Sequence, residues 1–146
     1  MTLLCDTSVL IAAMLKEHPD HPASFQVIQA IKQGRQRGAV ATHTVAECYA
    51  VLTALPKVPL VIPVEACGVI RKVVLELFDV IDLTAKDYEK ALDWVAERNL
   101  KSGAIFDALI AQAALKKKIP RLMTWNLKHF ERFSSGDLKV ITPVEF

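Results

Sequence analysis

The sequence predicts an α/β protein in which helices cover both faces of a central, mostly parallel sheet, forming a three-layer α/β/α sandwich. Two observations support this prediction. Short apolar segments of strand length alternate along the chain with longer segments of helical periodicity. The 146 residues, of which 52% are hydrophobic, are enough for one buried core. No repeat or composition break divides them, so residues 1–146 are expected to form a single domain.

The predicted strands are short and apolar, as expected for strands buried on both faces of a parallel sheet. There are five of them, in chain order Thr2–Cys5, Ala39–Ala41, Val80–Leu83, Arg121–Thr124 and Val140–Ile141.

The first three predicted helices follow from capping residues and apolar spacing. Asp6, Thr7 and Ser8 are three possible caps for a helix that runs to Leu15. The spacing of Phe25, Ile28 and Ile31 predicts a second helix, ending near Gly34 or Gly38. A third is expected to begin at Thr44, because apolar residues then recur at i, i+3, i+4 and i+7: Cys48, Val51, Leu52 and Leu55.

Three further helices are predicted after a proline-punctuated connection, Pro56–Pro63. Their expected spans are Val64–Leu77, a helix capped by Thr84 that ends at about Arg98, and Ala104–Lys117 after the break at Ser102 and Gly103. Lys116 and the two lysines after it are expected to lie in solvent at the end of this helix, where their positive charges interact favourably with the helix dipole.

Composition sets limits on function without choosing one. Eighteen basic and sixteen acidic residues leave a net charge of +2, which neither requires nor excludes a nucleic-acid partner. Cys5, Cys48 and Cys67 lack C-x-x-C spacing and have apolar neighbours, so we expect buried thiols in a reducing compartment. No uninterrupted apolar run of about 20 residues predicts a membrane span. The chain is therefore expected to be a soluble, cytoplasmic protein.

Two polar residues come just after predicted strands, at the edge where parallel α/β sheets bind ligands. Asp6 follows the first strand and Asn126 follows the fourth. Each also has a simpler interpretation: Asp6 as a helix cap, and Asn126 as a turn former and cap.

Two further carboxylates are candidates for the same site. Glu47 lies in Thr44-Val-Ala-Glu47, a capping-box pattern, and taken alone is better explained by capping. Asp107 lies in a helix that is apolar on nearly every side and, with Ser102 as the expected cap, beyond its first turn. A carboxylate in such surroundings must be paired, protonated or bound to a metal ion.

Together, four short motifs resemble those of the PIN-domain nucleases, and most closely those of the VapC-type toxins of bacterial toxin–antitoxin pairs. They are, in order, Asp6-Thr-Ser-Val-Leu-Ile, Glu47 early in a helix, Phe106-Asp-Ala-Leu-Ile-Ala and Thr124-Trp-Asn-Leu-Lys-His-Phe130. The resemblance covers the whole chain. It implies a PIN-like fold, a homodimer, a cognate antitoxin partner, and Mg²⁺- or Mn²⁺-dependent hydrolysis of RNA phosphodiesters.

The resemblance also implies roles for individual residues. Asp6, Glu47 and Asp107 would hold the metal, with Ser8 and Thr124 as supporting hydroxyls. The family often has a fourth aspartate where this chain has Asn126, so the number of metal ions, one or two, stays open.

The chemistry of these side chains agrees with the resemblance, because carboxylate oxygens are the ligands that Mg²⁺ and Mn²⁺ prefer. We expect Asp6 and Asp107 to be direct ligands, and Glu47 to be a ligand or to orient the attacking water. Asn126 would hold a metal-bound water or a ligand carboxylate. Three cationic or titratable side chains near the expected site are candidates for contacts with RNA phosphates: Lys128, His129 and Arg132.

Two other functions fit parts of the pattern. One is a phosphotransferase with Asp6 as the nucleophile, although Asp6-Thr7-Ser8 lacks the second aspartate that such enzymes usually carry. The other is a catalytically inactive PIN-like RNA-binding module, which Asn126 makes plausible.

Overall fold

The computed structural model of the chain describes residues 1–56 and 60–146, so residues 57–59 of the predicted connection lie outside the described part. Five strands form one sheet: β1 (Thr2–Cys5), β2 (Arg37–Ala41), β3 (Asp79–Ile81), β4 (Arg121–Met123) and β5 (Lys139–Ile141). They are ordered β3-β2-β1-β4-β5, and every neighbouring pair is parallel. The predicted parallel sheet is therefore confirmed.

The helices lie close to their predicted positions. They are α1 (Thr7–Met14), α2 (His21–Lys32), α3 (Thr42–Thr53), α4 (Pro63–Ile70), α5 (Ala85–Glu97), α6 (Ala104–Lys116) and α7 (Leu127–Glu131). Helix α2 ends just before Gly34, whose φ of 73° places it in the left-handed region that glycine adopts without strain.

Two local predictions were wrong, and two short elements were missed. The predicted helix Val64–Leu77 changes at Ile70 from an α-helix to a π-helical turn, η1 (Arg71–Leu75). Short α7 and the terminal 3₁₀ turn η2 (Pro143–Glu145) were not predicted, because segments of five and three residues carry almost no periodic signal. Cys67 is exposed, whereas Cys5 and Cys48 are buried thiols as expected.

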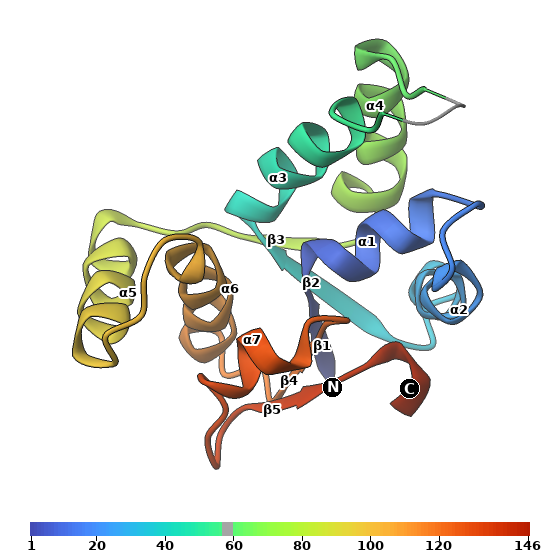
Figure 1. The fold of residues 1–146 in the computed structure, drawn as a ribbon. Helices are drawn as coiled ribbons and strands as arrows, with labels where there is room; N and C mark the ends of the chain where they lie inside the picture. The colour runs from blue at the N-terminus through green and yellow to red at the C-terminus, as the bar shows by residue number, and fades with distance from the viewer. Residues whose placement is uncertain (57–59) are drawn as a thin grey trace.

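Helices cover the sheet on both faces (Figure 1), with α1 to α4 on one side and α5 to α7 on the other. Alternating side chains of β1 supply both cores: Leu3 and Cys5 pack with the first layer, and Leu4 packs with the second. No helix in residues 1–56 or 60–146 is long and apolar enough to cross a membrane.

The strand order places a topological switch point between β1 and β4. The chain builds β2 and β3 on one side of β1 and then returns to add β4 and β5 on the other. At such a point the connections leave the sheet in opposite directions, and a ligand-binding crevice opens at the carboxyl ends of the strands. Asp6 follows β1 here, and Thr124 follows β4.

Candidate active site

A pocket of about 440 Å³ opens at the switch point and contains all four residues that the sequence suggested for the site. Asp6 comes from the end of β1, Glu47 from α3, Asp107 from α6 and Asn126 from the start of α7. The other lining residues are Thr7, Ser8, Ile11, His18, Asp20, Val51 and Trp125. His18 and Asp20 were missed, because nothing in the sequence indicates that the loop between α1 and α2 folds back to this pocket.

Asp6 does not cap α1, although it occupies the N-cap position. Its Oδ2 atom instead accepts hydrogen bonds from Ser8 Oγ at 2.9 Å and from Thr124 Oγ1 at 2.8 Å. The residue is 4% exposed, and burial raises the pKa of its carboxyl group above the usual range while these two bonds lower it.

The two hydroxyl groups that hold Asp6 are themselves fixed by the backbone after β4. Ser8 Oγ accepts from Trp125 N at 3.0 Å, and Thr124 Oγ1 accepts from Asn126 N at 2.9 Å. A hydroxyl has a single proton. Because each backbone N–H donates to a hydroxyl, both hydroxyl protons point at Asp6. This network ties β1 to β4, and it gives Ser8 and Thr124 the supporting position that the sequence suggested.

Glu47 does not form the predicted capping box. Helix α3 begins at Thr42, two residues before the expected Thr44, and the Thr44 hydroxyl has no partner among the described residues. Glu47 Oε2 is instead 3.1 Å from His43 Nε2, one turn earlier. This bond lowers the pKa of the Glu47 carboxyl group despite its partial burial, so the group is ionised and His43 is the donor.

Asp107 lies in the first turn of α6 and not beyond it, because the N-cap residue is Gly103, one residue after the expected Ser102. Ser102 is not its cap; its φ is 54°, in the left-handed region. Asp107 makes no cap bond either. Burial, followed by the negative charge of Asp6, raises the pKa of its carboxyl group to about 6.

Cationic side chains from α7 and the residue after it approach Asp107. Arg132 Nη2 is 3.3 Å from Asp107 Oδ2, and His129 Nδ1 is 3.9 Å from the same oxygen. Lys128 is exposed and lines an adjoining groove with Asn126 and His129. Asn126 is at the N-cap position of α7 but makes no capping bond with its side chain.

Each carboxylate is therefore turned toward a different partner: hydroxyls for Asp6, imidazole for Glu47 and guanidinium for Asp107. In these conformations no three His, Cys, Asp or Glu side chains of residues 1–56 and 60–146 are close enough together to hold a metal ion. Such separation is expected of like charges that share a pocket without a cation between them. The buried hydroxyl of Thr7, which lines the pocket, lies close enough to Glu47 to help lower the pKa of its carboxyl group.

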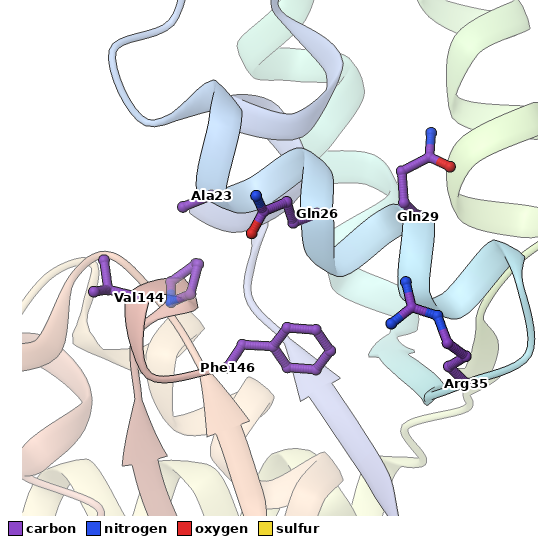
Figure 2. Close-up of a pocket in the computed structure, with 7 residues that line it drawn as sticks. Ala23, Gln26, Gln29, Arg35, Val144 and Phe146 are labelled. Atoms are coloured by element: carbon purple, nitrogen blue, oxygen red, sulfur yellow. The ribbon is translucent and has the colours of Figure 1, made fainter.

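A larger hollow of about 550 Å³ lies between α2 and the C-terminal segment, away from the acidic residues. Figure 2 shows Phe146 and Val144 facing α2, with Gln26 and Gln29 on that helix and Arg35 beyond its end. Arg35 is the sole titratable side chain that lines it. Because no general acid or base faces a nucleophile there, the acidic pocket is the better candidate for catalysis.

Comparison with known proteins identifies the family of the chain. A family model described as "PIN domain" matches residues 3–134. The protein named Ribonuclease VapC40 of Mycobacterium tuberculosis is 30% identical over 128 residues, which cover 88% of this chain and 89% of that protein.

Solved structures match the fold at lower identity. VapBC2 from Rickettsia felis, bound to a DNA fragment from its promoter, has a TM-score of 0.68 at 21% identity, covering 97% of this chain and 98% of that one. A toxin–antitoxin complex from Klebsiella pneumoniae has a TM-score of 0.66 at 20% identity, covering 97% of each chain.

Proposed function

This chain belongs to the PIN-domain family, and we propose that it is a metal-dependent endoribonuclease, the toxin of a toxin–antitoxin pair. The observation that carries the proposal is the convergence of three carboxylates from β1, α3 and α6 on one pocket at the switch point of the sheet. The similarity to a protein named as a ribonuclease supports RNA as the substrate.

The donor set suits Mg²⁺ or Mn²⁺, because the acidic side chains and Asn126 offer only hard oxygen ligands. Asp6 and Asp107 would be direct ligands, and Glu47 a ligand or the group that orients the attacking water. Among the described residues, Asp6 Oδ1 has no side-chain donor, so it stays available while Ser8 and Thr124 hold Oδ2.

Bound metal would polarise the scissile phosphate and lower the pKa of the attacking water. The remaining roles belong to side chains of the protein. Ser8 and Thr124 hold Asp6 in place and oppose the effect of burial on its charged form, and the bond to His43 holds Glu47 and favours its charged form. Arg132 places positive charge beside Asp107, with the His129 ring 3.9 Å from the same oxygen, and both side chains would be free to contact RNA phosphates once a cation replaces them there.

The proposal extends to the cellular setting. The toxin–antitoxin complexes among the structural relatives support an antitoxin partner, and family resemblance alone supports a homodimer. The free thiols of Cys5, Cys48 and Cys67 support action in the cytoplasm.

The test is cleavage of an unstructured RNA in Mg²⁺ or Mn²⁺ by wild type, Asp6→Asn and Asp79→Asn. Asp79 begins β3 at the opposite edge of the sheet and pairs with exposed Arg37, so it serves as the control. We expect Asp6→Asn to lose at least ~100-fold in rate, as when a group that stabilises developing charge is removed, and Asp79→Asn to match wild type. Near-normal cleavage by Asp6→Asn would contradict the assignment. An inactive but RNA-binding wild type would indicate a binding module, and a phosphorylated Asp6 would indicate a phosphotransferase.

A further inference from the structure

We infer that Phe106, backed by His43, is a stacking site for an unpaired base of the RNA, immediately beside the acidic pocket. The inference rests on the proposed function and adds to it a binding site for the nucleobase, in addition to the acids and cations that act on the phosphate.

Phe106 is an exposed aromatic residue on an otherwise buried helix. It is 45% exposed, whereas Leu109 and Ile110 on the following turn are almost completely buried. It immediately precedes Asp107, which lines the acidic pocket, and it stacks on His43, which is bonded to Glu47 of the same pocket. Leaving a large aromatic ring in water forgoes burial energy, and a ring with a free face can stack on a flat ligand.

The ring of Phe106 is held in a defined orientation. It stacks on the imidazole of His43 with a centroid distance of 4.8 Å and an interplanar angle of 6°. His43 is fixed in turn by its hydrogen bond to Glu47. The stack therefore joins α3 to α6 and connects the aromatic ring to a proposed metal-site carboxylate. A ring that is already ordered loses little conformational entropy when a flat ligand stacks on it.

The surroundings of Phe106 favour a nucleobase over a protein partner. The exposed residues that precede α6 are Lys101, Ser102 and Gly103, and a Cβ atom built at Gly103 would meet nothing within 4 Å. A protein interface is expected to have a contiguous apolar core. A lone aromatic ring beside a lysine, a glycine and an acidic pocket instead matches the way proteins bind single-stranded RNA, by stacking bases and attracting phosphates.

The chain contains a matched control for this geometry. His21 and Phe25 on α2 also stack, with a centroid distance of 5.1 Å and an interplanar angle of 27°, and Phe25 is 41% exposed. Neither Phe25 nor its immediate sequence neighbours line the acidic pocket, whereas Asp107, next to Phe106, does. If RNA binding depends on stacking next to the acidic residues, replacing Phe25 should leave the affinity for RNA unchanged.

The experiment measures RNA affinity by fluorescence anisotropy with a labelled, randomised 12-nucleotide RNA. All proteins carry Asp6→Asn to prevent cleavage, and the variants add Phe106→Leu, Phe106→Trp or Phe25→Leu. Leucine keeps apolar bulk and helix propensity but cannot stack, whereas tryptophan stacks at least as well. We expect Phe106→Leu to weaken binding about 5- to 100-fold, the range for one stacked base. Phe106→Trp and Phe25→Leu should bind like the parent.

Salt dependence separates stacking from electrostatics. Replacing the stacking ring of Phe106 should leave the slope of log Kd against log salt concentration unchanged, because no phosphate contact is lost. Unchanged affinity in Phe106→Leu would overturn the inference, and so would an equal loss in Phe25→Leu. A changed oligomeric state of Phe106→Leu at unchanged RNA affinity would identify a protein interface instead. Should Phe106→Leu fail to fold, a Phe106→Trp protein that folds but binds RNA at least fivefold more weakly would also contradict it.

The outcome is distinguishable from failure of the proposed function, because cleavage is measured separately without Asp6→Asn. If wild type cleaves RNA and Phe106→Leu cleaves it with unchanged kcat and KM, the ribonuclease stands and the stacking site does not. If wild type neither cleaves nor binds RNA, the proposed function itself fails.

Discussion

Asp87 and Asp107 lie on the packed helices α5 and α6, and the pKa values of their carboxyl groups shift in opposite directions. Asp87 Oδ2 accepts hydrogen bonds from Thr84 N at 2.7 Å, from Thr84 Oγ1 at 3.0 Å and from Lys116 Nζ at 2.7 Å. Lys116, then the backbone of Thr84, lowers the pKa of Asp87 to about 2. Burial and neighbouring negative charge raise the pKa of Asp107 to about 6.

The difference distinguishes a structural carboxylate from a functional one. Asp87 has enough donors for its charge, so folding favours its ionised form. Asp107 has only a long contact to Arg132 and a longer one to His129, so folding disfavours its ionised form. A carboxylate that folding leaves with few hydrogen-bond or ion-pair partners is a candidate ligand for a metal ion or substrate. We expect four properties of the protein to follow from this comparison.

Cleavage should show the largest difference. Asp107→Asn should lose at least ~100-fold in kcat/KM on RNA, because it removes charge where the proposed metal binds. Asp87→Asn should keep the wild-type rate when assayed well below its melting temperature. Equal losses in the two folded variants would show that both effects are indirect.

Stability without metal should respond in the opposite sense. Asp87→Asn leaves Lys116 without its partner and weakens the capping box of α5, so its free energy of unfolding should fall by about 2 kcal/mol. Asp107→Asn removes repulsion from Asp6 and should gain about 1 kcal/mol, as expected where function tolerates instability. Urea unfolding in chelator measures both. A clear loss of stability in Asp107→Asn would indicate a structural role for this carboxylate.

The pH dependence of stability should separate the two carboxylates. The folded protein keeps the proton of Asp107 up to about pH 6, whereas an unfolded aspartate releases it near 3.8, so this contribution is lost as pH rises from about 4 to about 6. The contribution of Asp87 is present above pH 4 and is lost as pH falls toward about 2. The free energy of unfolding should therefore be measured in chelator from pH 2 to 7. Asp107→Asn should lack the change between about pH 4 and 6, and Asp87→Asn should lack the change below pH 4. Two variants with superimposable pH profiles would contradict this assignment.

Removing the cationic partner of each aspartate should have the smallest effect. Arg132→Gln should strengthen Mn²⁺ binding by up to about 5-fold, because a partly exposed ion pair of up to about 1 kcal/mol no longer competes with the metal. Lys116→Gln should leave Mn²⁺ affinity unchanged and lower stability. Weaker Mn²⁺ binding in Arg132→Gln would mean that Arg132 positions Asp107 for the metal instead of competing with it.

The same pair of aspartates shows what could be predicted from sequence. Asp107 could be found because a carboxylate in an apolar helix needs an explanation that its own segment does not supply. The partner of Asp87 could not be found, and Lys116 was expected to be a solvated helix end. Asp87 and Lys116 are 29 residues apart in the sequence, and only the packing of α5 on α6 brings them together as an ion pair.

The acidic pocket shows a similar division. Asp6 and Asn126 could be placed together because parallel strands share a carboxyl edge. Glu47 had a sufficient local explanation in its capping-box pattern, and only the bond to His43 shows that this explanation was wrong. The stack of Phe106 on His43 depends on how α3 packs against α6, which no periodicity in the sequence encodes.

The most direct test of the metal site is calorimetric titration of wild type, Asp107→Asn and Asp87→Asn with Mn²⁺ at pH 7. We expect binding by wild type, equal binding by Asp87→Asn, and affinity at least ~10-fold lower in Asp107→Asn, as for loss of a charged ligand worth about 1.4 kcal/mol or more. Unchanged Mn²⁺ affinity in Asp107→Asn, or no binding by wild type, would contradict it.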